Sequence, residues 1–404
     1  MPATLNTGKA AVDGAMEHRS GSRFGIPGIP PDHTVTLFFC GDVMTGRGID
    51  QVLPHPASPE LYEDYVRNAR DYVDLATAAH GEIPAPVGFD YIWGDALGEL
   101  ARFRPSVRLI NLETSITRHS VPWPGKAIHY RMHPGNARCL QPAGIDFCAL
   151  ANNHVLDWGH EGLRETCRVL DRMGIAHAGA GANELSASRP ACVQPGPGAR
   201  VLIWSIGLAD SGIPREWAAR DEQAGVWRAG NAREGAEALV QQIGSEKRPG
   251  DLAVVSVHWG SNWGYRIPRE HTILARRLID AGADLIHGHS SHHIRGMELY
   301  RGRPILYGCG DFINDYEGLR GYESFRPDLA LMYFCRLAPA DGRLLRFWMT
   351  PMRRERFALH RANEEASRWL EDVLNRERRG DAPPFTRDEE GRLQWVRDAV
   401  ARQG

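Results

Sequence analysis

A recurring pattern limits the folds open to this chain: a short apolar run is followed at once by polar residues. The first run, Thr34 to Cys40, is rich in β-branched and aromatic side chains and leads into Gly41-Asp42. Nearly continuous apolar runs of this length are typical of strands that are buried on both faces. Similar runs recur at 107–110, 145–150, 200–206, 252–257, 283–286 and 304–307. The pattern predicts a central sheet whose strands end in polar side chains.

Helical segments separate several of these strands. The sequence predicts a helix over 161–173 and another over 268–281, the second with proline in its first turn. Alternating strands and helices are typical of α/β proteins. Further on, 329–335 and 344–350 alternate like an antiparallel pair that closes the domain. The predicted fold class is therefore a layered α/β sandwich.

The length of 404 residues exceeds the usual size of a single core, so one large domain with insertions and one domain with a tail both fit. We expect a loose lead-in over 1–30, a main domain over 31–360, and a charged helical appendage over 361–404 with helices at 364–378 and 389–401. Residues 51–93 are rich in aromatic side chains and form a predicted insertion. This insertion either shapes a substrate pocket or packs on the core.

Composition narrows the class of protein. A formal net charge of −2 gives no basic field, which argues against nonspecific binding to nucleic acid or to a membrane surface. The seven cysteines include no Cys-x-x-Cys pair and are interpreted as reduced core residues of a cytosolic protein. Residues 1–30 lack the continuous apolar run of a signal peptide, and no segment has the roughly 18 apolar residues of a membrane span. We expect a cytoplasmic protein; the sequence carries no signal for its oligomeric state.

A cluster of histidines follows the strand predicted at 283–286. Four of the seven residues from His287 to His293 are histidines. A neutral imidazole offers a nitrogen lone pair to a transition metal at neutral pH. The alternatives are a solvated polar loop and a purification tag, but the cluster is internal, interrupted by Gly and Ser, and preceded by a strand. The cluster therefore predicts metal binding.

The polar residues at the strand ends are of types that bind divalent metals. They are Asp42, Glu113, Asn153, His154, His258, His289 and His292. In open α/β sheets, ligands bind at the carboxyl ends of the strands. Mixed oxygen and nitrogen ligands suit a borderline divalent ion (Mn, Zn, Fe or Co) or a pair of such ions. We therefore predict a site for one or two divalent metal ions.

In their order along the chain, five motifs resemble those of one family. They are Gly41-Asp42, Asn111-Leu112-Glu113, Ala151-Asn152-Asn153-His154, His258-Trp259-Gly260 and Gly288-His289-Ser290-Ser291-His292. Together they resemble the poly-γ-glutamate capsule (CapA-type) branch of the calcineurin-like metallophosphoesterases. The resemblance covers residues 34–315. It implies a four-layered αββα sandwich with a metal site at the strand ends.

The resemblance also implies roles for individual residues. The implied metal ligands are Asp42, Asn153, His258, His289 and His292, with Glu113 in the place of the bridging aspartate and His293 as an alternative to His292. His154 resembles the general acid or substrate-binding histidine of the family. The superfamily's first motif is Asp-x-His, whereas this chain has Met44 in the place of that histidine. Because a thioether is a poor ligand for these ions, one metal position loses a ligand.

Three reactions are compatible with such a site. The first is hydrolysis of a phosphoester, in which His154 protonates the leaving group. The second is hydrolysis or transfer at a γ-glutamyl or related peptide bond. The third is epimerisation at the α-carbon of a peptide's C-terminal residue, the reaction of a cytoplasmic CapA-like group found beside ribosomal lasso-peptide pathways, which this chain resembles in lacking an export signal.

We predict a metal-dependent enzyme that acts on a peptide, with C-terminal epimerisation as the sharpest hypothesis. A small phosphorylated substrate and a non-catalytic metal-binding scaffold remain alternatives. Epimerisation requires two acid/base groups on opposite faces of the substrate. His154 is the candidate for one, and His293, Asp157 or His160 for the other.

Three further residues are predicted to support the site. Arg131 and Arg47 are candidates for binding a carboxylate or phosphate of the substrate, since a guanidinium pairs with such groups through two parallel hydrogen bonds. A surface salt bridge is the alternative for Arg131. Asp311 is the candidate for a carboxylate that orients a metal-bound histidine.

Overall fold

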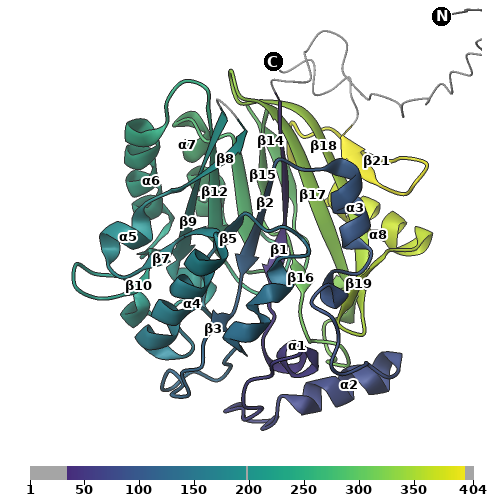
Figure 1. Ribbon diagram of the computed structural model, residues 1–404. Coiled ribbons are helices and arrows are strands. Elements are labelled where there is room, and N and C mark those ends of the chain that lie inside the picture. Colours follow the sequence, from purple (N-terminus) through teal and green to yellow (C-terminus); the bar gives the residue numbers. More distant parts are fainter. Residues whose placement is uncertain (1–33, 197–198, 396–404) are drawn as a thin grey trace, which may run out of the picture. The chain divides into compact units, whose positions relative to one another are not determined.

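Two β-sheets form the middle of the structure, a computed structural model that describes residues 34–196 and 199–395 (Figure 1). The lead-in predicted for 1–30 lies outside the described residues. The first sheet has ten strands. Their order is β21 (Phe385–Arg387), β22 (Leu393–Trp395), β18 (Arg343–Glu355), β17 (Leu329–Ala338), β1 (Val35–Val43), β2 (Val107–Leu112), β5 (Phe147–Ala149) and β6 (Ala176–Ala178), with β16 (Asp311–Ile313) beside β1 and β19 (Ala358–Arg361) beside β18.

The second sheet has eight strands. Their order is β11 (Arg228–Ala229), β9 (Ala199–Leu208), β12 (Asp251–His258), β13 (Leu285–His289), β15 (Arg303–Leu306), β14 (Met297–Tyr300) and β20 (Arg379–Gly380), with β8 (Ala191–Gly196) beside β9. The neighbours β9, β12, β13 and β15 are parallel. Their carboxyl ends therefore lie along one edge of the sheet.

Strand β1 shows how the layers are built. Leu37 and Phe39 belong to an apolar core shared by both sheets, which also contains Val254 of β12. Phe38 and Cys40 point to the opposite face and join a second core. Because successive side chains of a strand alternate in direction, a strand with apolar residues at every position must be covered on both faces. The sequence-based prediction of a doubly buried strand is confirmed.

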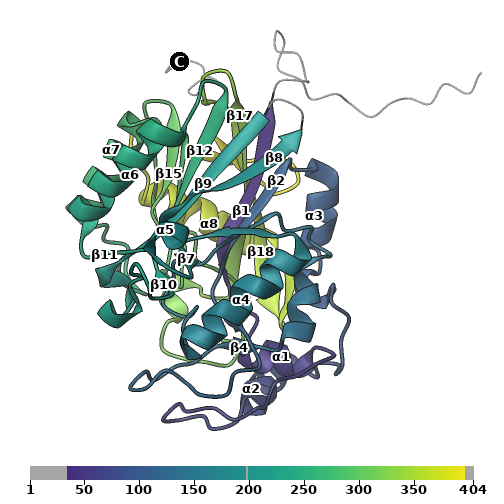
Figure 2. The ribbon, with the colours of Figure 1, turned by 60° about the vertical axis from the view of Figure 1, so that its left-hand side comes forward.

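Helices complete the two outer layers (Figure 2). Helices α6 (Ala232–Glu246) and α7 (Arg269–Asp280) pack their apolar residues on the second sheet. Helices α3 (Ala96–Phe103) and α4 (Gly159–Met173) contribute to the core on the outer face of the first sheet. The order helix, sheet, sheet, helix is the αββα sandwich that the resemblance implied.

The C-terminal part differs from the prediction. Helix α8 (Glu364–Arg376) is present, but the helix predicted at 389–401 is wrong over its described part, because residues Leu393–Trp395 form β22 and pair with β18. β20 likewise extends the second sheet. Phe385 and Trp395 are buried in the core between the sheets. Within the described range, residues after 360 therefore belong to the main fold and not to an appendage.

The aromatic insertion at 51–93 begins in the last turn of α1 (Arg47–Val52) and contains α2 (Arg70–His80) and the 3-10 helix η2 (Tyr91–Trp93). Tyr72 and Trp93 are fully buried, so part of the insertion packs on the core. Helices α1 and α2 lie beyond the carboxyl end of β1, at the bottom of Figure 1. The remaining short elements are β3 (Ser115–Ile116), β4 (Arg131–Met132), β7 (Ala180–Gly181), β10 (Gly225–Val226), α5 (Glu184–Ser188), η3 (Pro134–Leu140), η4 (Ala209–Ser211), η5 (Arg215–Trp217) and η6 (Glu323–Phe325).

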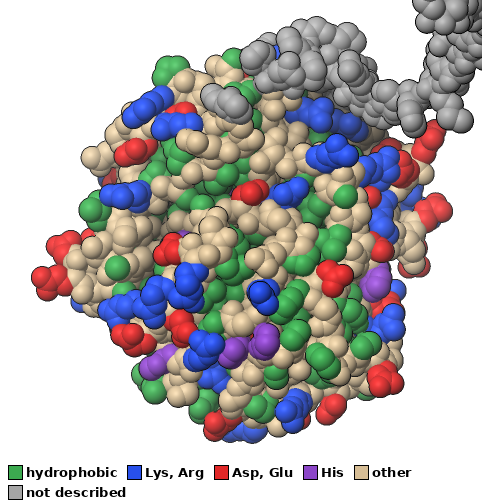
Figure 3. Space-filling view, in the orientation of Figure 1, with side chains coloured by type: hydrophobic (Ala, Val, Ile, Leu, Met, Phe, Trp, Pro, Cys, Tyr) green, Lys and Arg blue, Asp and Glu red, His purple; other side chains and the backbone are tan. Residues whose placement is uncertain are grey.

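The surface agrees with the near-neutral composition. Basic and acidic side chains are interspersed over the face drawn in Figure 3.

None of the helices in the described part of the chain has both the length and the apolarity needed to cross a bilayer. All seven cysteines are free thiols and five of them are buried, but the prediction of a core position is wrong for Cys192, which is exposed on β8.

Candidate metal centre and acid/base site

Both sheets deliver polar side chains to the same edge. In the second sheet, His258 and His289 are direct neighbours in the parallel pairing of β12 with β13. In the first sheet, Asp42 near the end of β1 is paired with Asp311 of β16. Gly41 makes this approach possible, since a Cβ there would lie 1.6 Å from the carbonyl oxygen of Gly310. The fold thus brings together residues that are far apart in sequence.

These residues form two groups that share Asp42. One ligand atom from each of Asp42, His258 and His289 lies within 4.8 Å of the others, and the same holds for Asp42, His292 and Asp311. The predicted ligands Asp42, His258, His289 and His292 are therefore close together. Asp311, predicted to orient a ligand, itself offers a carboxylate oxygen to the second group. The sulfur of Met44 instead accepts a hydrogen bond from the backbone N–H of Gly46.

Hydrogen bonds fix the tautomer of His289. The Nε2 of His287 lies 2.8 Å from the carbonyl oxygen of Cys40, which only accepts, so this nitrogen carries the proton. The Nδ1 of His287 must then accept from the hydroxyl of Ser256, at 3.0 Å. The Ser256 oxygen in turn accepts from Nε2 of His289, at 2.9 Å. The Nδ1 of His289 is left with a free lone pair, as a metal ligand requires.

The neighbouring histidine completes this donor set. Nδ1 of His258 lies 2.9 Å from Nδ1 of His289, and Nε2 of His258 lies 3.1 Å from Oδ1 of Asn153. Since Nδ1 of His289 is unprotonated, two ring nitrogens this close need a proton or a cation between them. The Oδ1 of Asp42 lies 3.7 Å from the same nitrogen of His289. This arrangement of nitrogen and oxygen atoms suits a divalent metal ion.

The carboxylates point to the same conclusion. The amide of Asn111 donates to Asp42 at 2.8 Å and to Glu113 at 3.1 Å, which holds these two carboxyl groups together. Burial, followed by the charge of Asp311, raises the pKa of Asp42 to about 7. Burial, followed by the charge of Asp42, raises the pKa of Glu113 well above its ordinary value. Buried carboxylates this close need either a bound proton or a metal cation to offset their charge, and a divalent ion can take that place.

His154 forms a dyad with Asp157. Nδ1 of His154 lies 2.7 Å from Oδ2 of Asp157, and Nζ of Lys126 lies 2.7 Å from the other carboxylate oxygen. Lys126 is also 3.1 Å from Nδ1, but it has Asp157 and the carbonyl of Ile128 as shorter acceptors. Because the Asp157 carboxylate oxygen accepts at 2.7 Å, Nδ1 carries the proton and donates to Asp157. This leaves Nε2, which lies 4.0 Å from Oε1 of Glu113, as the reactive nitrogen.

The surroundings keep His154 neutral. Burial, followed by the charges of Lys126 and Arg47, lowers the pKa of His154 well below its ordinary value. A neutral imidazole protonated on Nδ1 has a lone pair on Nε2 and acts as a general base. Asp157 therefore orients His154 from behind and does not face it across a substrate. Sequence reasoning missed Lys126, because this residue lies in a loop 28 residues before His154.

Two tyrosines complete the wall beside His154. The Tyr130 ring stacks on the His154 ring, with centroids 3.8 Å apart, and its backbone N–H donates to Asp157 at 2.6 Å. The hydroxyl oxygens of Tyr130 and Tyr316 are 2.5 Å apart. Burial is the largest cause that raises the pKa of both phenols, so both keep their protons. Sequence reasoning assigned neither residue a role, since tyrosine in a loop is not a metal or acid/base motif.

His293 lies apart from this dyad. Its Nδ1 is 3.1 Å from the carbonyl oxygen of Ile294, and its ring packs among Trp263, Tyr265 and Phe325. Burial lowers its pKa to about 4. Neither metal group contains it, so His292 and not His293 takes part in the second group. His160 lies on α4 with its ring against Trp123.

Arg47 is held in a buried ion-pair cluster. Its guanidinium is 2.9 Å from Glu63 and 2.5 Å from Asp315, and it also donates to the hydroxyl of Tyr72. These contacts tie α1 to the insertion and to the segment after β16. They leave the predicted binding of a substrate anion without structural support.

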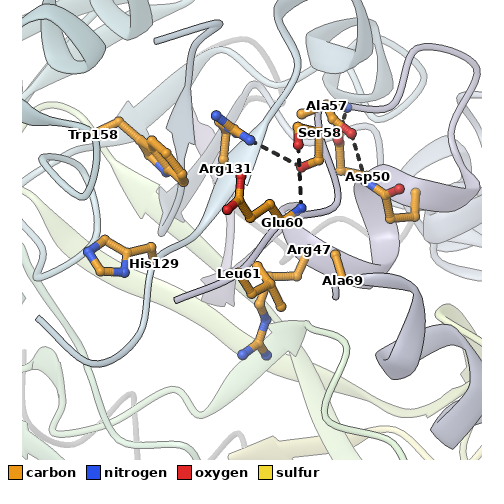
Figure 4. Close-up of a pocket in the computed structure, with 11 residues that line it drawn as sticks. Arg47, Asp50, Ala57, Ser58, Glu60, Leu61, Ala69, His129, Arg131 and Trp158 are labelled. Carbon is orange, nitrogen blue, oxygen red and sulfur yellow. Dashed lines mark hydrogen bonds between the residues drawn. The ribbon is translucent and has the colours of Figure 1, made fainter. Parts of the chain in front are cut away.

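Arg131 lines a separate, small pocket between the insertion and the segment around Trp158 (Figure 4). Its guanidinium lies 3.9 Å from the centre of the Trp158 ring and donates to the backbone carbonyls of His119 and Ser58. In the described residues the lining of this pocket includes no member of the two metal groups. The predicted role of Arg131 in binding a substrate anion therefore stays a prediction.

Comparisons with known proteins agree with this site. Residues 36–316 match the family described as "Bacterial capsule synthesis protein PGA_cap". A probable polyglutamine synthesis accessory protein of Mycobacterium tuberculosis is 48% identical over 348 residues, which are 86% of this chain and 91% of the relative. The PGA biosynthesis protein CapA of Bacillus subtilis is 26% identical over 72% of this chain and 67% of its own length. The capsule biosynthesis protein CapA of Bacillus anthracis is 28% identical over 72% of this chain and 62% of its own length.

The matched range contains every residue of the two metal groups as well as the His154–Asp157 dyad. It also spans the strands of both sheets that carry these residues. The chain therefore belongs to the bacterial capsule synthesis (PGA_cap) family, the CapA-type branch of the calcineurin-like metallophosphoesterases.

Proposed function

We propose that this protein is a metal-dependent enzyme that acts on a peptide, and that His154 removes a proton from the α-carbon of the peptide's C-terminal residue. The observation that carries the proposal is the His154–Asp157 dyad, which leaves the unprotonated Nε2 of His154 facing Glu113 beside the two metal groups. A buried neutral imidazole is suited to accept a proton from carbon when the charge that develops is stabilised nearby.

The residues of the two groups would hold the metal. Asp42, His258, His289 and Asn153 would form one position, and Asp42, His292 and Asp311 the other. Asp311 would offer a ligand where Met44 does not. A bound divalent ion would supply positive charge that offsets the negative charge developing on the substrate's carboxyl group.

The chain's own residues divide the remaining work. Asp157 holds the imidazole in the productive orientation, and Lys126 neutralises Asp157. Epimerisation also needs a group that returns the proton from the opposite face. Three residues were predicted for this role. Asp157 lies behind His154, His293 packs against Trp263, and His160 packs against Trp123. These positions favour none of the three.

A second candidate is hydrolysis or transfer at a γ-glutamyl or related peptide bond. It is favoured by the relatives named for polyglutamine synthesis and for PGA biosynthesis. The same neutral His154 would then deprotonate the attacking nucleophile. Phosphoester hydrolysis is less well supported, because His154 would have to carry a second proton to act as the acid. Cytoplasmic location and the lack of nucleic-acid and membrane partners stay predictions.

The test is deuterium exchange. Protein loaded with Mn²⁺ is incubated in D2O with peptides that end in a free carboxylate, and with the same peptides ending in an amide as matched controls. We expect deuterium at the C-terminal α-carbon of the free acids only, and none with His154→Ala. A shortened peptide with no deuterium would support the second candidate. Release of phosphate from a phosphomonoester, or no change in any substrate, would contradict both.

A further inference from the structure

Two tyrosines from distant parts of the chain meet between His154 of the dyad and His292 of the second metal group. Tyr130 immediately precedes β4, and Tyr316 follows β16. The ring of Tyr130 stacks on His154, at 3.8 Å and 22°. The ring of Tyr316 meets His292 edge to face, at 5.4 Å and 85°. Their hydroxyls, 2.5 Å apart, therefore join the wall beside the dyad to the wall beside the metal groups.

The two hydroxyls together carry one more proton than the single hydrogen bond between them can use. Each phenol carries one O–H, and only one of the two protons can lie in the bond between the oxygens. Neither hydroxyl has another hydrogen-bond partner among residues 34–196 and 199–395. One O–H is thus left to donate outward. An unused donor at a largely buried position is costly, so its natural acceptor is a ligand or water in the site.

Burial indicates which hydroxyl points outward. Tyr130 is only 4% exposed and lies under the guanidinium of Arg47, whose carbon is 4.8 Å from the ring centre. Tyr316 is partly exposed. The arrangement that satisfies both is a relay in which Tyr130 donates to Tyr316 and Tyr316 donates into the site.

The relay rests on a rigid base. Asp315, next to Tyr316, binds the Arg47 guanidinium through both carboxylate oxygens and also accepts from the backbone N–H of Gly48. Arg47 in turn lies over the rings of Tyr130 and Tyr316. A donor held in place before the substrate arrives stabilises negative charge without reorganisation. This gives the buried Arg47 cluster a positioning role.

We propose that the Tyr316 hydroxyl, backed by Tyr130, donates a hydrogen bond to an anionic oxygen of the substrate. The chemistry fits a carboxylate or a phosphoryl oxygen, the two anions that the candidate reactions present. The inference rests on the proposed function for the identity of the substrate, but the donor itself follows from the proton count.

The test removes each hydroxyl while keeping its ring. Tyr316→Phe, Tyr130→Phe and the control Tyr300→Phe are compared as full chains loaded with Mn²⁺. The hydroxyl of Tyr300 also has one partner, Asp280 at 3.3 Å, on an exposed face. Metal content is measured first, and then the affinities for acetate and inorganic phosphate by calorimetry. We expect Tyr316→Phe to bind at least one anion about 10- to 100-fold more weakly, Tyr130→Phe to lose less, and Tyr300→Phe to match the wild type.

Turnover of the preferred peptide provides a second measurement. For Tyr316→Phe we expect kcat/KM to fall about 100-fold with bound metal unchanged, as for loss of one preorganised donor. Unchanged anion affinity in Tyr316→Phe, loss of its metal, a larger loss in Tyr130→Phe, or a wild type that binds neither anion would each overturn the inference. If the wild type exchanges no deuterium yet Tyr316→Phe still loses anion affinity, the proposed function fails and the donor stands.

Discussion

At the scale of single residues, the proton arrangement around His154 determines which chemistry is available. Asp157→Asn keeps the size of the side chain but lets an amide N–H face Nδ1 of His154. The ring then shifts its proton to Nε2 and loses its base. We expect turnover to fall about 10²- to 10⁴-fold, the range attributed to acid/base catalysis, with metal content unchanged. Steady-state kinetics and metal analysis measure both, with the exposed Asp221→Asn as control. Wild-type turnover would show that Asp157 does not orient His154.

Ser256 tests the tautomer of His289. Its hydroxyl joins His287 to His289, and Ser256→Ala removes the acceptor that holds the proton on Nε2 of His289. We expect the affinity for the metal to fall about 10- to 100-fold, as for other partners of metal-bound histidines. Competition with a chelator measures this affinity. Ser245→Ala, an exposed hydroxyl on α6, should leave the affinity unchanged, and an equal loss in both variants would count against the tautomer.

At the scale of elements, the close crossing of β1 over the loop before β16 is decisive. A methyl group at Gly41 would meet the Gly310 carbonyl oxygen at 1.6 Å, so Gly41→Ala must move the backbone next to Asp42. We expect about 3 kcal/mol or more of lost unfolding free energy. The control is Gly244→Ala in α6, where the new Cβ would meet nothing within 4 Å beyond the backbone of its own helix, and there we expect a gain of about 0.4–1 kcal/mol. Denaturant unfolding of both variants measures the difference, and equal stabilities would contradict this close contact.

A second prediction at this scale concerns β22, one of the last strands of the chain. Trp395 of β22 is 4% exposed and packs against Phe347 and Phe385. Trp395→Ala should cost about 3–5 kcal/mol of unfolding free energy, as expected for a buried tryptophan. Leu185→Ala, at a side chain that is 67% exposed, should cost little. If Trp395→Ala unfolds at the wild-type denaturant concentration, the segment is an appendage after all.

At the scale of the whole molecule, metal binding and stability are linked through Asp42. Its pKa rises from 3.8 to about 7 in the metal-free fold, so the folded state binds this proton more tightly than the unfolded state does. The contribution of Asp42 to stability is therefore greatest below pH 4 and is lost as pH rises towards 7. We expect metal-free Asp42→Asn to gain stability relative to the wild type across this window. Added Mn²⁺ should stabilise the wild type more than the variant; a pH-independent difference would be evidence against the buried charge.

Much of the framework followed from sequence because its physics is local. Continuous apolar runs, without alternating polar residues, predicted β1, β2, β9, β12 and β13, since strands buried on both faces have no polar side. The histidine cluster and the strand-end residues pointed to a metal, because those side chains have few other uses in such positions. The helix predicted at 389–401 failed since three residues of β22 are stabilised by pairing with β18, a partner far away in sequence.

Most of the central strands, the layers that their apolar faces require and the residue types of the metal groups therefore follow from local sequence. How those side chains are used depends on the folded arrangement of the chain. It placed Asp311 with His292, put Asp157 behind His154, separated His293 from the dyad, and brought Lys126, Tyr130 and Tyr316 to the site. The physical reason is that proton positions and ligand contacts depend on distances of a few ångströms between chain segments. No local pattern encodes those distances.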